Sequence, residues 1–131
     1  MHERKTRYAV YNINYHMVWM PKYRRNVLTE DMKAEMQKLF AVTAARNDME
    51  ILAAEVMPDH IHLFMSTPPR LSPSDVVNMF KGVSARWLRA RFPELKKPGD
   101  ALWTRTCCIG TAGSVTEETI RRYIEEQTAK S

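Results

Sequence analysis

Two histidines separated by one residue are the side chains of this sequence best suited to hold a metal ion. His60 and His62 lie in a segment of residue types typical of a β-strand, MPDHIHLFM at 57–65. Because side chains alternate along a strand, both imidazoles point from one face of the sheet. Ile61 and Leu63 then point from the other face into a core. Such a pair is also common in purely structural strands, so a metal site needs a third ligand from elsewhere.

The C-terminal segment carries a tyrosine and a glutamine at helical spacing. Tyr123 and Gln127 are four residues apart, so they share one face of a helix predicted over residues 116–129. This helix has a narrow apolar stripe and must dock against another surface to be stable. Gly110 and Gly113 before it would permit movement or exchange between subunits. On pattern alone, the simpler interpretation is that the tyrosine is an amphipathic anchor and the glutamine a solvent-facing side chain.

Period-two and helical patterns predict the elements that position these side chains. Strands are predicted over residues 11–19, 50–57, from 60 to the Thr67-Pro68-Pro69 segment, and 102–109. A first helix follows its cap at Thr29 and runs to about Asn47. A second helix follows a capping box at Ser72 and Asp75. Its predicted buried stripe consists of Val76, Val77, Phe80, Val83, Trp87 and Leu88.

The order β-α-β-β-α-β-α predicts an α+β fold, the ferredoxin-like (RRM-like) antiparallel sheet with an added C-terminal helix. Two helices would cover one sheet face and leave the other free. We predict one domain over residues 1–131, with a core at about 8–110, a hinge at 110–115 and the last helix at 116–129.

Composition favours an intracellular protein with a polyanionic partner. The chain has 20 Lys and Arg against 15 Asp and Glu, a net charge of +5. Basic residues cluster at 22–25 and 81–97 with Tyr23 and Trp87 among them, which suits nucleic acid, although a solvated surface has the same composition. We expect a cytoplasmic location without a membrane segment, because no apolar run is long enough to span a bilayer. The adjacent Cys107 and Cys108 are expected to be buried thiols.

Five motifs in fixed order carry a resemblance to a known family. They are YHxVWxPKYRR at 15–25, VMPDHIHL at 56–63, FKGxSAR at 80–86, LW at 102–103 and RYIExQ at 122–127. The chain resembles the small single-tyrosine HUH transposases (TnpA type) of bacterial and archaeal insertion sequences, which move as single-stranded DNA. The resemblance extends from about Tyr8 to Gln127. It departs at Thr106-Cys107-Cys108, where the family often has an aromatic pair, which puts local packing in question.

The resemblance implies a catalytic role for each half of the site. His60, His62 and the side-chain oxygen of Gln127 would hold Mg²⁺ or Mn²⁺, which suit oxygen and imidazole ligands. Tyr123 would attack the scissile phosphate, form a 5′-phosphotyrosine and free a 3′-hydroxyl. Asp59 is most simply a turn residue, and alternatively a partner of a ligand histidine.

The resemblance also implies the partners. Family members are dimers in which the last helix completes the partner's site, and they recognise hairpins near the ends of their element. We therefore expect a homodimer that binds hairpin-bearing single-stranded DNA. The candidate phosphate contacts are Lys22, Arg24, Arg25, Lys81 and Arg86. His16 shares a strand face with Asn12 and Asn14, and is either near the DNA or structural.

Three other functions remain compatible with the sequence. One is a non-catalytic nucleic-acid-binding module, because RNA-recognition domains share the predicted topology. Another is a metal-dependent hydrolase that uses water, with Tyr123 structural. The third is a domesticated relative that cuts genomic hairpins without moving an element of its own.

Overall fold

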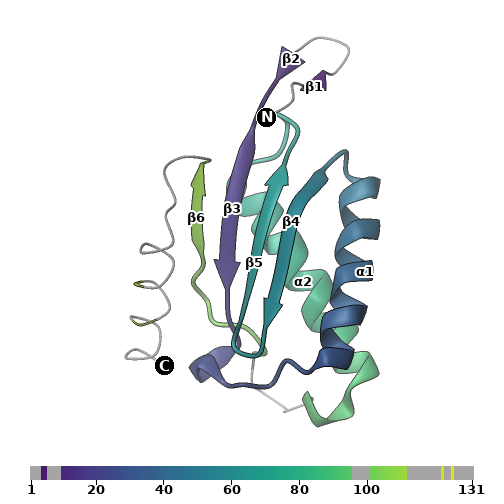
Figure 1. The fold of residues 1–131 in the computed structure, drawn as a ribbon, viewed down its shortest axis with the longest axis vertical. Coiled ribbons are helices and arrows are strands. Elements are labelled where there is room, and N and C mark those ends of the chain that lie inside the picture. Colours follow the sequence, from purple (N-terminus) through teal and green to yellow (C-terminus); the bar gives the residue numbers. More distant parts are fainter. Residues whose placement is uncertain (1–3, 6–9, 96–100, 112–121, 123–124, 126–131) are drawn as a thin grey trace.

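An antiparallel sheet with helices on one face forms the molecule (Figure 1). The computed structural model describes residues 4–5, 10–95, 101–111, 122 and 125. Within these residues the main sheet has four strands in the order β4-β5-β3-β6. They are β3 (Asn14–Trp19), β4 (Glu50–Met57), β5 (His60–Ser66) and β6 (Cys108–Thr111). Two short strands, β1 (Arg4–Lys5) and β2 (Val10–Tyr11), pair beyond one end of this sheet.

Two long helices cover the same face of the sheet, α1 (Glu30–Arg46) and α2 (Pro73–Arg91). Short 3-10 helices follow β3 and α2, η1 (Lys22–Arg24) and η2 (Pro93–Leu95). The order β3-α1-β4-β5-α2-β6 with this strand arrangement confirms the predicted ferredoxin-like fold.

The predicted helix caps are present in the structure. The Thr29 side chain accepts a hydrogen bond from the Met32 amide, 3.3 Å long. Ser72 and Asp75 form the reciprocal capping box, with bonds of 3.0 and 3.2 Å. These contacts satisfy amides that have no partner within the helix, and so set where each helix begins.

Alternation along β3 and β5 builds the core between sheet and helices. Ile61, Leu63 and Met17 are fully buried on the helix-facing side. Phe40 of α1 and Phe80 of α2 meet edge to face, with ring centroids 5.5 Å apart. The predicted inward face of β5 is therefore confirmed, and the opposite face of the same strand is left for the histidines.

The first and last predicted strands have bounds that differ from the prediction. The predicted strand over 11–19 is interrupted at Asn12 and Ile13, and the last strand lies at Cys108–Thr111 instead of 102–109. The reason is a different role for Trp103, which forms an isolated bridge to Pro21. Its indole donates to the Lys81 carbonyl at 3.1 Å and is held in the core. The chain therefore reaches strand geometry only after this anchor.

Trp87 is not part of the buried stripe of α2, and the prediction was wrong for it. The side chain is 38% exposed, while Val83 is only half-buried. The indole Nε1 donates to Glu35 of α1 at 3.3 Å, and the Arg91 guanidinium lies 5.3 Å from the ring centroid. An indole at the rim of a helix pair can bury its ring and keep its N–H on a polar partner. The stripe is thus narrower than predicted.

The predicted hinge and last helix fall largely outside the described residues. Gly110 and Thr111, the start of the predicted hinge, belong to β6. Tyr123 and Gln127 are not described, whereas Arg122 and Glu125 have helical conformation and are exposed. A search of the described helices finds none with the length and apolar character needed to cross a membrane.

Phe40→Ala is expected to destabilise the protein by about 3–5 kcal/mol, since a fully buried ring would be replaced by a cavity. This is a large fraction of the roughly 5–15 kcal/mol of a typical domain. Trp87→Ala, the matched control, should cost about 1 kcal/mol or less, because this indole is already partly in water. Chemical denaturation measures both values. Equal losses would contradict the described position of α2.

Candidate functional site

The histidines of β5 lie on the sheet face that the helices leave open. Their side chains are 19% and 20% exposed for His60 and His62, whereas the intervening Ile61 is fully buried. β5 is paired with β4 on one side and β3 on the other, so its backbone is held along both edges. The predicted common face of the two imidazoles is confirmed.

A chain of charged groups fixes the ring of His60. Its Nδ1 lies 2.9 Å from Oδ1 of Asp59, and Oδ2 of the same carboxylate accepts from Nε of Arg24 at 2.9 Å. Burial raises the pKa of Asp59, but the hydrogen bonds from Arg24 and His60 more than offset this and hold the pKa below its usual range. The carboxylate is therefore ionised and holds the proton on Nδ1, which leaves Nε2 of His60 as the ring's lone-pair nitrogen. Asp59 thus contacts a predicted ligand histidine, which is the second of the two roles that the sequence analysis gave it.

Arg24 reaches Asp59 from an unusual backbone turn. Tyr23 and Arg24 have φ angles of 65° and 51°, in the left-handed region that non-glycine residues seldom occupy. Such a conformation costs roughly 1–2 kcal/mol per residue. The turn also places the Lys22 ammonium 5.4 Å from the Tyr23 ring centroid. The segment just after β3 is thereby folded back toward the β4–β5 turn, and the basic cluster comes to lie beside His60.

His62 contacts a third histidine that the sequence did not link to it. His16 Nδ1 lies 3.0 Å from His62 Nε2, and the His16 ring stacks on Phe64 with centroids 4.2 Å apart. Burial lowers the pKa of His16. Burial, and secondarily the neighbouring His16, lowers the pKa of His62 as well, although Glu55 opposes this. Both rings are therefore neutral at neutral pH and have lone pairs to donate.

The missed contact follows from the pairing of β3 with β5. His16 is opposite Phe64 and Val18 is opposite His62, so the two histidines are diagonal neighbours on one face. The strand parity of His16 was visible in the sequence, but the register between two strands 46 residues apart was not. Across β4, Glu55 lies directly opposite His62, with its carboxylate 4.0 Å from Nδ1.

The five candidate DNA contacts separate into two groups. Lys22, Arg24 and Arg25 form the turn next to the histidines. Lys81 and Arg86 belong to α2, on the other face of the sheet. The Lys81 ammonium is half-buried and donates to the Thr104 carbonyl at 2.7 Å, and burial lowers the pKa of this lysine. Of the first group, Arg24 reaches the histidines through Asp59, whereas the Arg25 side chain lines a cavity elsewhere.

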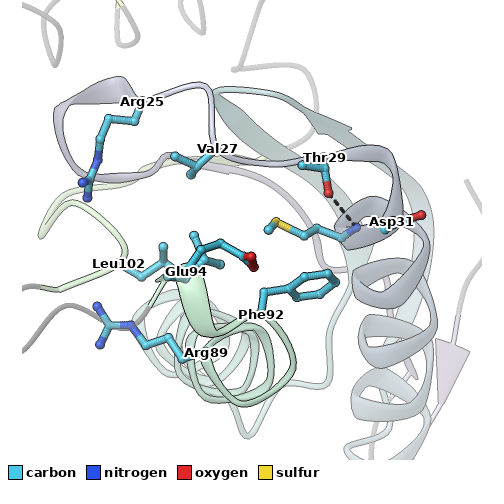
Figure 2. Close-up of a pocket in the computed structure, with 10 residues that line it drawn as sticks. Arg25, Val27, Thr29, Asp31, Arg89, Phe92, Glu94 and Leu102 are labelled. Carbon is cyan, nitrogen blue, oxygen red and sulfur yellow. Dashed lines mark hydrogen bonds between the residues drawn. The ribbon is translucent and has the colours of Figure 1, made fainter.

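A cavity of about 550 Å³ lies between the segment before α1 and the end of α2 (Figure 2). Val27, Phe92 and Leu102 supply apolar walls, and Arg25 and Arg89 face each other along one side. Of the predicted site residues that the structure describes, only Arg25 lines it. The cavity is thus separate from the histidine face.

The described residues contain part of the predicted metal site. Among them, no group of three or more His, Cys, Asp and Glu side chains has the arrangement of a metal site. The third predicted ligand, Gln127, and the predicted nucleophile, Tyr123, lie outside these residues. The thiols of Cys107 and Cys108 are free but only half-buried, so the prediction of buried thiols was wrong. Their partial burial raises the pKa of each.

A family comparison identifies the class of protein to which this chain belongs. The model of the family described as "Transposase IS200 like" matches residues 9–127. The chain therefore belongs to the IS200-like transposases.

Individual relatives agree with this assignment. The ISDra2 transposase TnpA of Deinococcus radiodurans is 38% identical over 126 residues, which cover 95% of this chain and 90% of the relative. The transposase of insertion sequence element IS200 from Salmonella typhimurium is 30% identical over 127 residues, covering 95% and 83%.

Two solved structures share the fold. A crystal structure of a transposase from Deinococcus radiodurans R1 has a TM-score of 0.87 and 37% identity, and the match covers 95% of this chain and 97% of that one. A REP-associated tyrosine transposase bound to a REP hairpin has a TM-score of 0.59 and 15% identity, covering 93% and 68%. The second likeness concerns the fold alone.

Proposed function

We propose that this transposase cleaves and rejoins single-stranded DNA at insertion-sequence ends, with Tyr123 as nucleophile and a divalent cation at His60, His62 and Gln127. The observation that carries the proposal is the histidine face: two partly buried imidazoles on a rigid strand, one of them oriented by Asp59. In a chain of the IS200-like family, this is the arrangement expected for the fixed half of a metal-assisted phosphoryl-transfer site.

The described side chains fit a cation of the Mg²⁺ or Mn²⁺ type. The Asp59 contact holds the proton on Nδ1 of His60, so that Nε2 would be available to bind a cation. This carboxylate–histidine–metal arrangement is common in metalloproteins. His62 is neutral at neutral pH, as a ligand must be. When bound, the cation would polarise the scissile phosphate and stabilise the charge that develops on it. Two imidazoles and an amide oxygen leave room for phosphate oxygens and water.

The bonds that form and break in strand transfer belong to the tyrosine and the DNA alone. The Tyr123 hydroxyl loses its proton and attacks phosphorus, while the bond from phosphorus to the 3′-oxygen breaks and that oxygen takes up a proton. The products are a 5′-phosphotyrosine and a free 3′-hydroxyl. Attack of a 3′-hydroxyl on the phosphotyrosine reverses the chemistry and rejoins DNA without ATP.

The proposed substrate is single-stranded DNA with subterminal hairpins. Arg24 supplies positive charge beside His60 through Asp59, and Lys22 and Arg25 lie near the exposed Tyr23 ring of the same turn, which offers a stacking surface for an unpaired base. Lys81 and Arg86 on α2 would contact DNA only where it passes around the sheet. A REP-associated transposase of the same fold is bound to a hairpin, which supports this substrate through the fold only.

We further propose a homodimer as the working unit. Each chain has one candidate nucleophile, and joining two transposon ends requires two covalent intermediates at once. A dimer provides both, with the last helix of one chain completing the site of the other.

An adduct assay tests the proposal. The protein is incubated with hairpin-bearing single-stranded DNA and Mn²⁺ or Mg²⁺, and a covalent protein–DNA species resistant to denaturation is expected. Cleavage without an adduct would favour a hydrolase that uses water. Binding without cleavage would favour a non-catalytic module. A gene flanked by subterminal palindromes would favour a mobile element over a domesticated relative.

Asp59→Asn is expected to weaken Mn²⁺ binding about 10- to 100-fold, the usual loss when a residue behind a metal ligand is changed. The amide removes the negative charge that holds the proton on Nδ1 of His60. Titration calorimetry with Mn²⁺ measures the change. Asp48→Asn is the matched control, because Asp48 also binds an arginine at 2.9 Å but lies among exposed side chains. Equal losses of Mn²⁺ affinity in the two variants would argue against a role for the Asp59–His60 contact in metal binding.

A further inference from the structure

The backbone of Tyr23 has a conformation that its residue type disfavours. Among the residues that the structure describes, the non-glycine residues with positive φ are Tyr23 at 65°, Arg24 at 51° and Asp48 at 59°. Aspartate is enriched in the left-handed region, whereas a bulky side chain there is a genuine outlier. Strained residues persist where the surrounding structure fixes them, and they cluster at catalytic and ligand-binding sites. The tyrosine at this position therefore needs an explanation beyond local propensity.

Burial of the tyrosine ring does not offset the strain. Tyr23 is the most exposed of the large hydrophobic side chains in the described part of the chain, at 53%. The turn is held by its backbone instead. The Lys22 amide donates to the Leu102 carbonyl at 2.9 Å. The Arg24 amide donates to the Pro21 carbonyl, also at 2.9 Å. These bonds use no atom of the tyrosine ring, so the turn does not depend on it.

The turn lies next to His60, a proposed metal ligand. Arg24, the residue after Tyr23, bonds to Oδ2 of Asp59 at 2.9 Å, and Oδ1 of the same carboxylate contacts His60 at 2.9 Å. The Leu28 amide adds a bond to the Pro58 carbonyl at 3.1 Å. η1 and the turn between β4 and β5 are thus joined at one end of the sheet (Figure 1). A DNA strand that brings a phosphate to His60 passes this turn.

Two cations flank the exposed ring. The Lys22 ammonium lies 5.4 Å and the Arg25 guanidinium 5.7 Å from the centroid of the Tyr23 ring. A nucleotide presents a flat base with a phosphate close to it, so an aromatic ring with cations beside it matches both parts. The bases of a paired stem are already stacked on one another. The ring therefore fits an unpaired nucleotide.

We propose that Tyr23 positions the DNA strand for cleavage, and that an unpaired base beside the scissile phosphate stacks on its ring. The chain keeps a strained backbone at Tyr23 because this conformation presents the ring to the DNA. The inference rests on the proposed function and adds to it a residue that acts on the place of the strand and takes no part in the attack on phosphorus.

Tyr23→Gly tests the inference, because glycine removes the ring and accepts a positive φ. Loss of one base–aromatic stack is expected to raise the dissociation constant for hairpin-bearing single-stranded DNA about 5- to 150-fold, measured with a chelator present. The midpoint of chemical denaturation should stay the same or rise, because the backbone strain is relieved. Tyr23→Phe keeps the ring and should retain the affinity of the unaltered protein.

Asp48→Gly is the matched control for the change of backbone. It makes the same replacement at another left-handed position, just before β4 begins and so at the opposite end of the sheet from η1. Its affinity for the DNA should equal that of the unaltered protein.

Photocross-linking identifies the stacked base. 5-Iodouracil is placed at each unpaired position of the DNA in turn, and ultraviolet light links it to an aromatic side chain on which it stacks. We expect a cross-link to residue 23 from one position, in the unaltered protein and in Tyr23→Phe. The same position should give no cross-link to residue 23 in Tyr23→Gly.

The remaining outcomes separate this inference from the proposed function. Unchanged DNA affinity in Tyr23→Gly, or cross-links only to other residues, would overturn the role of Tyr23 and leave the proposed strand transfer standing. A fall in both affinity and denaturation midpoint would make the ring structural and would also overturn it. No binding of the DNA by the unaltered protein would overturn the proposed substrate itself.

Discussion

Tyr123→Phe is expected to abolish the covalent protein–DNA adduct and to reduce strand cleavage by roughly 10⁴-fold or more. Phenylalanine keeps the ring but has no oxygen to attack phosphorus. Binding of the hairpin should remain, because the basic turn at Lys22–Arg24 and the sheet are untouched. Single-turnover cleavage of a labelled hairpin oligonucleotide, analysed on a denaturing gel, measures both adduct and product.

Tyr23→Phe is the matched control for this experiment. Tyr23 is 53% exposed and lies in the basic turn beside the histidines, so its hydroxyl is the one most easily mistaken for the nucleophile. The control should retain the adduct. An adduct that persists in Tyr123→Phe and disappears in Tyr23→Phe would show that Tyr23 is the nucleophile.

The double variant His60→Ala/His62→Ala is expected to lose cleavage by at least about 10²- to 10³-fold, the cost of removing one electrostatic stabiliser of a transition state. Both imidazoles would hold the cation that balances charge on the phosphate. The fold should survive, because both side chains lie on the open face and the core residues of β5 are unchanged.

Two measurements distinguish loss of the metal ion from loss of the folded structure. The thermal midpoint should fall while unfolding stays cooperative, since each substitution removes a partly buried imidazole with one side-chain hydrogen bond, at a cost of about 0.5–1.5 kcal/mol per bond. Hairpin affinity measured with a chelator present should also be unchanged. Full cleavage by the double variant would show that cleavage does not require these histidines.

The parts of the fold that were predicted correctly are those set by local signals. Thr29 and Ser72 mark helix starts by capping, and the alternation around His62 assigns the two faces of β5. The errors arise where a distant partner decides. The Trp103 indole donates to a carbonyl of α2, and β6 begins only after this residue. The Trp87 indole donates to Glu35 of α1 and lies outside the core.

The site follows the same rule. The common face of His60 and His62 is a property of one strand, and period two is sufficient to predict it. The contacts of His16 with His62 and of Arg24 with Asp59 join residues 46 and 35 positions apart. They depend on strand register and on left-handed φ angles that no propensity predicts.

The pairing of β3 with β5 makes the chemistry of this protein inseparable from its folding. Met17 lies opposite Leu63 in the core, while His16 lies opposite Phe64 on the open face. A slip of β3 by one residue would exchange these faces, placing imidazoles among the helices and a methionine in water. Misaligned chains would therefore be unstable as well as inactive. Quality control that removes poorly folded chains would also protect the fidelity of DNA rearrangement.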